Sequence, residues 1–202
     1  MAKEKKKKTS ALVIAIAFIL GLILGYAISE TIQTPEEVKE FETGENILQN
    51  SGFENEIEGE PAYWYKAYIA ADNLTITWDN DIAYTGERSV SINNTHIYDE
   101  KVCNNWAQTI NTVPIGRIVE LSGYAKTTDA ESVVMVIQCW DKDSNMVGFA
   151  TTQSDGNISG TTEWTKYNTS LTIPEETQSI IIRLVLTGTG QVWFDDVSLV
   201  VI

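Results

Sequence analysis

Short runs of β-forming residues, separated by turn formers, fill the chain from residue 46 onward and constrain its fold most. The runs lie at 90–92, 106–112, 118–126, 133–141, 146–153, 165–173, 179–187 and 191–200. Gly, Asn, Asp and Pro separate them, and no stretch among them has a convincing amphipathic helical period. Many short strands at near-even spacing predict an all-β sandwich.

The last run changes the side of its apolar residues at a pair of carboxylates. Val192 and Phe194 share one parity, and Val197 and Leu199 share the other, with Asp195–Asp196 between them. Because side chains in a strand alternate with period two, the change predicts burial on both faces or a β-bulge at the pair. Carboxylates inside an apolar strand need a partner. Either a hard cation binds there, or Asp195 faces water while Asp196 accepts backbone N–H groups.

The N-terminal segment is typical of a membrane anchor. Residues 1–10 are strongly basic, and an uncharged apolar run, Ala11 to Ile28, follows them. As a helix this run is about 27 Å long, close to the hydrocarbon thickness of a bilayer. A signal peptide cleaved near 27–29 is the alternative, although the run exceeds the usual apolar core of about 7–15 residues. We predict a transmembrane signal-anchor helix at 11–29, with the N-terminus cytoplasmic and the remainder outside the cell membrane.

The exported part of the chain is acidic. Residues 30–45 contain several Glu residues and Pro35 and few large apolar residues, as expected of a linker ahead of the domain at 46–202. Five of the 14 Lys and Arg residues and one of the 28 Asp and Glu residues precede residue 29, which leaves nine basic against 27 acidic residues, a net charge near −18. Such a surface repels nucleic acid and attracts divalent cations.

Two local patterns predict glycosylation sites and a turn. Asn73, Asn93, Asn157 and Asn168 each begin an N-x-Ser/Thr sequon, and four sequons in an exported domain fit a surface glycoprotein. Residues 141–145 (DKDSN) resemble the opening of a calcium loop, but Met146 stands where the EF-hand pattern requires Gly. A polar hairpin turn is the preferred interpretation.

Several motifs resemble, in the same order, those of jelly-roll carbohydrate-binding modules. Residues 46–54 (NILQNSGFE) are similar to the entry strand of families 4, 9 and 22 and of the wider galactose-binding-like superfamily. The further motifs are Trp64, 84–90 (YTGERSV), 106–110 (WAQTI), 121–126 (LSGYAK), Trp164 ahead of Pro174, and 194–199 (FDDVSL). The resemblance covers nearly all of 46–202 and implies a jelly-roll β-sandwich that binds carbohydrate without catalysis.

The resemblance also implies a structural calcium that joins the first and last strands. Carried over by position, its ligands are the side chains of Glu54 and Asp196 and the carbonyls of Gly52 and Arg88. Thr85 stands where a side-chain oxygen is often supplied, and its hydroxyl is a poorer ligand than a carboxylate. We expect the ion to stabilise the fold by tying together the two ends of the domain.

Carbohydrate recognition needs exposed aromatic rings and planar polar side chains. Arg183 lies on the second face of an otherwise apolar strand, Gln138 shares a face with Trp140, and Trp106 shares one with Gln108. Placed on the jelly roll, the residues expected to line the concave sheet are Trp106, Gln138, Trp140, Phe149 and Arg183. Trp64, Trp164 and Trp193 stand at framework positions of the resembled family and are expected in the core. The alternative assigns Trp106 and Gln108 to the framework as well and puts Arg183 in a plain salt bridge.

The remaining reactive groups do not form a catalytic set. His96 is the one histidine, and no Ser/His/Asp order or Cys cluster accompanies it, so we predict no enzyme. Cys103 and Cys139 form a disulfide if their Cα atoms lie within about 7 Å, and otherwise Cys139 is a buried thiol. The sequence thus predicts a membrane-anchored cell-surface module that binds poly- or oligosaccharide. The alternative is a structural or adhesive module that contacts a surface protein.

Overall fold

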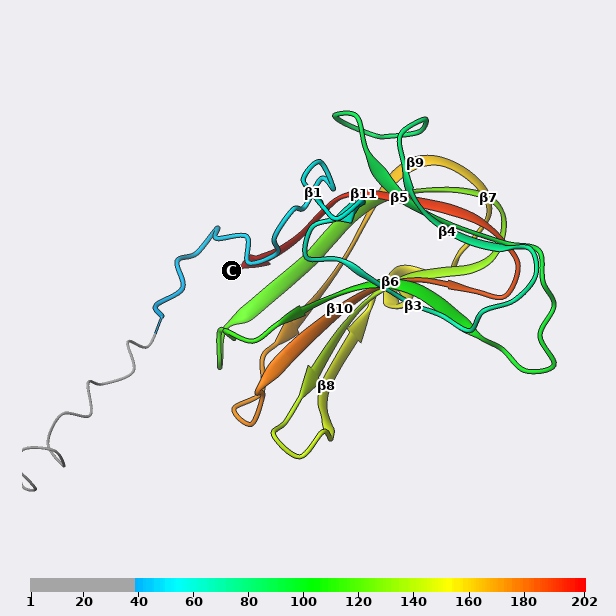
Figure 1. Cartoon of the computed structure of the whole chain (residues 1–202). Helices are drawn as coiled ribbons and strands as arrows, with labels where there is room; N and C mark the ends of the chain where they lie inside the picture. Colours follow the sequence, from blue (N-terminus) through cyan, green and yellow to red (C-terminus); the bar gives the residue numbers. More distant parts are fainter. Residues whose placement is uncertain (1–38) are drawn as a thin grey trace, which may run out of the picture. The chain divides into compact units, whose positions relative to one another are not determined.

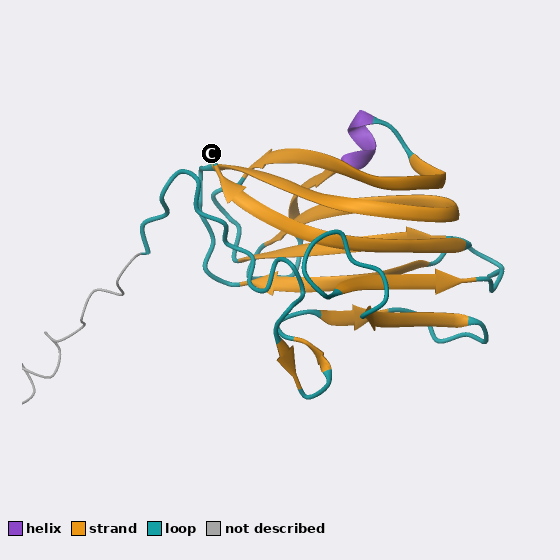
Figure 2. Cartoon of the chain, turned by 90° about the horizontal axis from the view of Figure 1, so that it is seen from above, coloured by secondary structure: helices purple, strands orange, loops and turns teal. Residues whose placement is uncertain are grey.

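From residue 39 to residue 202, the part of the chain that the computed structural model describes, the polypeptide is built of β-strands (Figure 1). The strands are β1 (Glu56–Ile57), β2 (Glu60–Pro61), β3 (Tyr65–Ala67), β4 (Leu74–Asp79), β5 (Ser89–Asn94), β6 (Cys103–Ile110), β7 (Ile118–Trp140), β8 (Met146–Thr151), β9 (Ile158–Thr172), β10 (Ser179–Thr187) and β11 (Gly190–Val201). One 3₁₀ turn, η1 (Thr152–Asp155), follows β8 and is the purple segment of Figure 2. The all-β prediction is confirmed.

The predicted tail and transmembrane helix, and most of the predicted linker, lie outside the described residues. Within residues 39–202, no helix has the length and hydropathy needed to cross a membrane. The unit described below is Glu40–Ile202.

One long strand, β7, joins two layers into a sandwich (Figures 1 and 2). Its first part pairs with β9 and β11, and its second part pairs with β8 and β10. One layer therefore has the order β3-β6-β10-β7-β8 and the other has the order β4-β5-β11-β7-β9. The register with β9 shifts repeatedly between Ala125 and Val133, and Asp129 adopts a φ of 47° there. These irregularities bend β7 from one layer into the other.

The core lies between the layers and uses alternate residues of each strand. Ile180, Ile182 and Leu184 of β10 are fully buried, as are Val192 and Phe194 of β11. The apolar periodicity of the sequence therefore identifies the inward faces of both layers. Burial of this apolar surface is the main stabilising contribution.

The predicted runs match most of the strands. The run at 179–187 coincides with β10, whereas those at 118–126 and 133–141 are two parts of the single strand β7. Strands β1 to β4 were not predicted. β1 to β3 have two or three residues each, too few for a periodic signal, whereas the six residues of β4 (LTITWD) alternate apolar and polar and could have been predicted.

The predicted bulge in the last strand is confirmed. The register between β11 and β7 shifts between Asp195 and Ser198, and Asp196 has a left-handed φ of 48°. The chain near Asn46 runs along the same strand, where Asn46 bridges Val200 and the Ile47 N–H donates to the Leu199 carbonyl. The first and last segments of the domain therefore meet at the bulge.

Candidate functional site

The outer face of the layer β3-β6-β10-β7-β8 carries most of the residues predicted to bind sugar. Directly opposed residues of antiparallel strands share a face, so the register defines rows across this layer. The central row is Tyr65, Ala107, Arg183, Val136 and Thr151, and the next is Thr109, Ile181, Gln138 and Phe149. The flanking rows are Ala67, Asn105, Val185 and Val134 on one side and Ser179 with Trp140 on the other. We call the surface formed by these four rows the Arg183 face.

Arg183 is held at the centre of this face by two neutral acceptors. Its Nε donates to Gln138 Oε1 at 2.9 Å, and one terminal nitrogen donates to Asn105 Oδ1 at 2.9 Å. No ion pair joins it to a carboxylate in the described part of the chain, so the salt-bridge alternative is wrong there. The arrangement fixes the plane of a partly buried guanidinium while leaving its charge uncompensated.

Aromatic side chains flank the guanidinium. Tyr65 is 43% exposed, with its hydroxyl 3.1 Å from Thr109 Oγ1, and Phe149 at the other end of the face is 52% exposed. Four strand spacings of about 4.8 Å separate β3 from β8, so the strands that carry the two rings run roughly 19 Å apart across the layer. Trp140 is half-buried, and its Nε1 is buried without a hydrogen-bond partner among residues 39–202. The face thus combines two open rings with a fixed planar cation.

Trp106 does not belong to this face, which corrects the prediction. It opposes Leu184, whose side chain points into the core, and it is 0% exposed. Its Nε1 donates to the Ser91 carbonyl of β5 at 3.2 Å, across the sandwich, and Lys66 Nζ lies 5.0 Å from the centroid of its ring. The framework alternative is therefore correct for Trp106 and for the buried Gln108, whose amide bonds the backbone of Gln49.

Three residues of the face were missed in the sequence. Tyr65 lies in the three-residue strand β3, which gives no periodic signal. Thr109 lies on β6, where Trp106 was predicted to face outward, so that Thr109 was predicted to face inward. Asn105 is the neighbour of Trp106 and therefore has the opposite orientation in β6. Only the register with β10 shows that Asn105 and Thr109 face outward.

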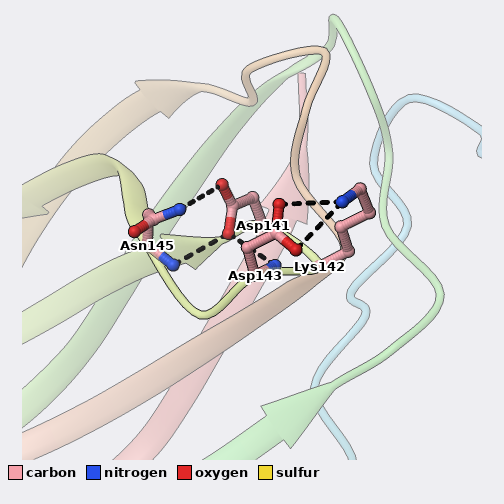
Figure 3. A network of polar contacts seen from close by, with 4 residues as sticks. All are labelled: Asp141, Lys142, Asp143 and Asn145. Atoms are coloured by element: carbon pink, nitrogen blue, oxygen red, sulfur yellow. Dashed lines mark hydrogen bonds and ion pairs between the residues drawn. The ribbon is translucent and has the colours of Figure 1, made fainter.

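The 141–145 loop forms the predicted polar hairpin at the end of β7 (Figure 3). Asp141 Oδ1 accepts the backbone N–H groups of Asp143 and Asn145, and its Oδ2 accepts the Asn145 side chain. These bonds, led by the one from the Asn145 side chain, lower the pKa of Asp141. Ser144 takes the left-handed position with a φ of 63°. Both Asp141 oxygens thus accept hydrogen bonds that stabilise the turn. This is the arrangement of a polar hairpin, whereas in a calcium loop these oxygens would bind the ion.

Acidic side chains are absent from the Arg183 face and gather elsewhere. No Asp or Glu occupies any of its row positions. A separate pocket of about 330 Å³ shares no residue with the face and lies between the loop at 95–102 and the turn between β10 and β11. Asp99, Glu100 and Glu131 line it, together with His96, Tyr98 and Lys101. The acidic character of the chain therefore does not extend over the face.

The residues predicted to bind calcium meet at the bulge of β11. Glu54 Oε1 accepts the N–H groups of Glu87 and Arg88 at 3.0 and 3.1 Å. Thr85 Oγ1 donates to Asp196 Oδ1 at 2.9 Å, and a Cβ on Gly52 would lie 3.4 Å from the same oxygen. Three segments distant in the sequence therefore place two carboxylates and a hydroxyl side by side. We call this arrangement the bulge cluster.

Glycine is favoured within the bulge cluster at position 86, where the backbone is left-handed. Gly86 has a φ of +63°, and a Cβ there would lie 2.1 Å from Glu54 Oε1. The carboxylate therefore packs directly against the backbone of the 84–88 loop, where it reaches the two N–H groups.

Asp195 supports the loop from inside. It is 0% exposed, and its Oδ2 accepts the N–H groups of Tyr84 and Thr85 while its Oδ1 accepts that of Asp196. The expectation that Asp195 faces water is therefore wrong. Burial raises the pKa of this carboxyl to about 6 despite the three N–H bonds, which oppose the shift.

The donor set of the bulge cluster fits a hard divalent cation. Glu54 Oε2 and Asp196 Oδ2 have no hydrogen-bond partner in the described part of the chain, and no Lys or Arg side chain pairs with either carboxylate there. Arg88 stacks its guanidinium on the Trp78 ring, 4.2 Å from the centroid. Within residues 39–202 no three His, Cys, Asp or Glu side chains form a metal cluster, so backbone carbonyls would have to complete the shell.

The two cysteines are not paired, and the disulfide alternative is wrong. Cys103 opposes Thr187 and Cys139 opposes Ile180 on the same strand β10. Seven residues of strand separate these positions, roughly 23 Å, far beyond the reach of a disulfide.

The four predicted glycosylation sites lie on strands or loops of the described domain. Asn73, Asn157 and Asn168 are exposed, and Asn93 is partly buried. Glycosylation of these sites remains a prediction.

Comparison with solved structures shows that the fold is that of jelly-roll carbohydrate-binding modules. The xylan-binding domain CBM22-1 of Paenibacillus barcinonensis Xyn10C superposes with a TM-score of 0.58 at 15% identity, over 80% of this chain and 97% of that one. The module TmCBM61, solved with β-1,4-galactotriose, has a TM-score of 0.51 at 20% identity, over 78% and 99%. The predicted family resemblance is thus confirmed at the level of the fold.

A larger protein contains a similar domain. The enzymatically active domain of bacteriophage CBA120 tailspike protein 4 has a TM-score of 0.62 at 19% identity, and the match covers 78% of this chain but 21% of that one. No protein-family model matches the chain, and no curated protein matches it.

Proposed function

We propose that this protein is a non-catalytic module that binds carbohydrate through the Arg183 face. The observation that carries the proposal is the combination on one open sheet face of the exposed rings of Tyr65 and Phe149 with the oriented guanidinium of Arg183. Aromatic rings present apolar faces that cover the C–H face of a sugar ring, and planar polar groups bind its hydroxyls. Rings carried on strands roughly 19 Å apart suit a chain of several sugar residues better than a single one.

The similarity of the fold to modules described as binding xylan and galactotriose supports this proposal. Because the identities are 15% and 20%, the similarity carries neither the ligand nor the contact residues over to this chain. The side chains of the Arg183 face themselves are therefore what favours binding.

We further propose that calcium stabilises the module at the bulge cluster. Glu54 and Asp196 would hold the ion, with Thr85 and the carbonyls of Gly52 and Arg88 as neighbouring oxygen donors. The ion would supply positive charge between two carboxylates that otherwise repel each other, and it would link the first segment of the domain to the last strand. The role is structural, because none of these residues belongs to the Arg183 face.

We also propose that Ala11–Ile28 anchors the module in the cell membrane, with the domain outside. The length of the apolar run and the preceding lysines support this topology. Extraction of the membrane fraction with alkaline carbonate tests it, since a spanning protein stays with the lipid and a peripheral one is released.

Retention of the full chain in gels containing soluble polysaccharides tests the proposed function. Neutral and uronate-containing xylans, galactans and β-glucans form the panel. Tyr65→Ala and Phe149→Ala are expected to weaken binding at least about fivefold each, since each removes a stacking surface. Tyr84→Ala is the matched control, because Tyr84 is 40% exposed but stacks on Tyr124 in the other layer.

Two results of the retention experiment would rule out the proposed sugar site. If no polysaccharide retards the protein, or if Tyr84→Ala abolishes retention while both face variants keep it, the Arg183 face is not a sugar site. A structural or adhesive module that contacts a surface protein is then the remaining interpretation.

A further inference from the structure

The charge distribution on the Arg183 face indicates what kind of sugar it takes. We propose that the ligand carries carboxylates, as in a uronic-acid-containing polysaccharide, and that Arg183 binds a uronate group. This inference depends on the proposed function, because it specifies the ligand of the same face.

The charge of Arg183 is not balanced by its side-chain partners. Both of its side-chain partners, Gln138 and Asn105, are neutral amides. A partly buried charge is stabilised most by an opposite charge, and no carboxylate of the described chain provides one. A ligand carboxylate would provide it.

Acidic residues are absent from the row positions of the Arg183 face. The chain has 28 Asp and Glu residues among 202, yet none occupies a row position on any of the five strands. A face for neutral sugars has no need of this exclusion, because carboxylates are good acceptors for sugar hydroxyls. A face for a polyanion requires it, since like charges in contact repel.

The N–H groups of Arg183 that make no bond to Gln138 or Asn105 have a defined geometry. A guanidinium has five N–H groups, and two of them are engaged by Gln138 and Asn105. The three that remain belong to the two terminal nitrogens. Adjacent N–H groups on these nitrogens form the fork that matches a carboxylate bidentately. Held at Nε and at one terminal nitrogen, the fork is oriented before the ligand arrives.

Paired probes that differ in charge alone test the proposal with the full chain in detergent micelles. Calorimetric titration at 0.15 M salt and pH 7 compares oligogalacturonate with its methyl ester, and glucuronoxylan with its carboxyl-reduced form. The acidic member of at least one pair is expected to bind roughly 10- to 100-fold more tightly, the effect of charge-assisted hydrogen bonds.

Variants assign the effect to Arg183. Arg183→Gln is expected to abolish the preference of the acidic probe over its neutral partner, and Arg183→Lys is expected to keep part of it through charge without the fork. Lys101→Gln removes the same charge from the separate acidic pocket and is expected to leave the preference unchanged. Should Arg183→Gln fail to fold, the ratio within each probe pair for the unaltered protein still tests whether the ligand carries carboxylates, and Arg183→Lys tests the part of Arg183.

The outcomes separate the two proposals. Equal binding of acidic and neutral partners, lost in Phe149→Ala, overturns the uronate inference and leaves the sugar site standing. A preference that survives Arg183→Gln also overturns it. Absence of binding to every probe overturns both.

Discussion

In the absence of calcium, protonation of Asp195 at lower pH is expected to stabilise the domain, whereas a carboxylate whose pKa is lowered in the folded state destabilises a protein in acid. Burial raises the pKa of Asp195 from the ordinary 3.8 to about 6. The folded protein therefore holds this proton more tightly than the unfolded chain does. Its unfavourable contribution to stability is present in full above pH 6 and vanishes as the pH falls below about 4.

The size of the effect follows from the shift. About two pKa units at about 1.36 kcal/mol each give an upper limit near 3 kcal/mol in the free energy of unfolding. Other carboxylates act in the opposite direction, since the lowered pKa of Asp141 adds stability that is lost in acid. The comparison must therefore isolate Asp195 from them.

Urea denaturation of the wild type and of Asp195→Asn between pH 4 and 7.5, both with chelator, provides that comparison. The variant has one acceptor oxygen for three N–H groups, which costs about 1–3 kcal/mol at every pH. Relative to the variant, the wild type is expected to gain up to about 3 kcal/mol as the pH falls from 7 to 4. A difference that stays constant, or that grows as the pH rises, would refute the reasoning, because the N–H groups would then outweigh burial.

Three further results are expected. Millimolar calcium should raise the melting temperature, by the equivalent of about 2.7 kcal/mol in the free energy of unfolding at 100 times Kd. Glu54→Gln should lose this increase, and the surface change Glu163→Gln should keep it. Equal increases in both variants would exclude the bulge cluster as the calcium site. Native alkylation should label Cys103, which is exposed, and should reach Cys139 only after unfolding, because Cys139 is buried and burial raises the pKa of its thiol. A disulfide between Cys103 and Cys139 of the same chain would contradict the register of β10. Gly190→Ala should cost more than about 2 kcal/mol in urea denaturation, because φ is +111° and the new Cβ would lie 2.4 Å from Ala130 Cα. Gly44→Ala carries similar backbone strain, with φ at +91°, but meets no atom within 4 Å, so it should cost less and isolates the clash.

Local patterns were sufficient for the strands from β5 onward and for the bulge. Alternating isoleucines and leucines delimit β10 because every second residue must enter the core. The change of parity at Asp195 predicted an irregularity for the same reason, and it occurs between Asp195 and Ser198. In both cases the relevant interaction is between near neighbours in the sequence.

The composition of the Arg183 face could be predicted only in part, since it depends on pairing between distant strands. The alternation of β6 shows that Trp106 and Gln108 share one side of the strand, but it does not show whether that side faces the core or solvent. The pairing of Trp106 with Leu184 of β10 places this side in the core. Tyr65 enters the face because three residues pair with β6. Their own sequence carries no strand signal. The two cysteines show the same limit, because their separation is set by the length of β10 and not by their spacing.

The continuity of β7 has a consequence for how the two layers unfold. The same strand supplies Gln138 to the Arg183 face and, through its first half, supports the β11 segment that carries the bulge cluster. Detaching either layer would require breaking β7 or stripping it from its partners. We therefore expect the domain to unfold in a single cooperative transition, in which an ion bound in one layer also protects the backbone amides of the other from hydrogen exchange.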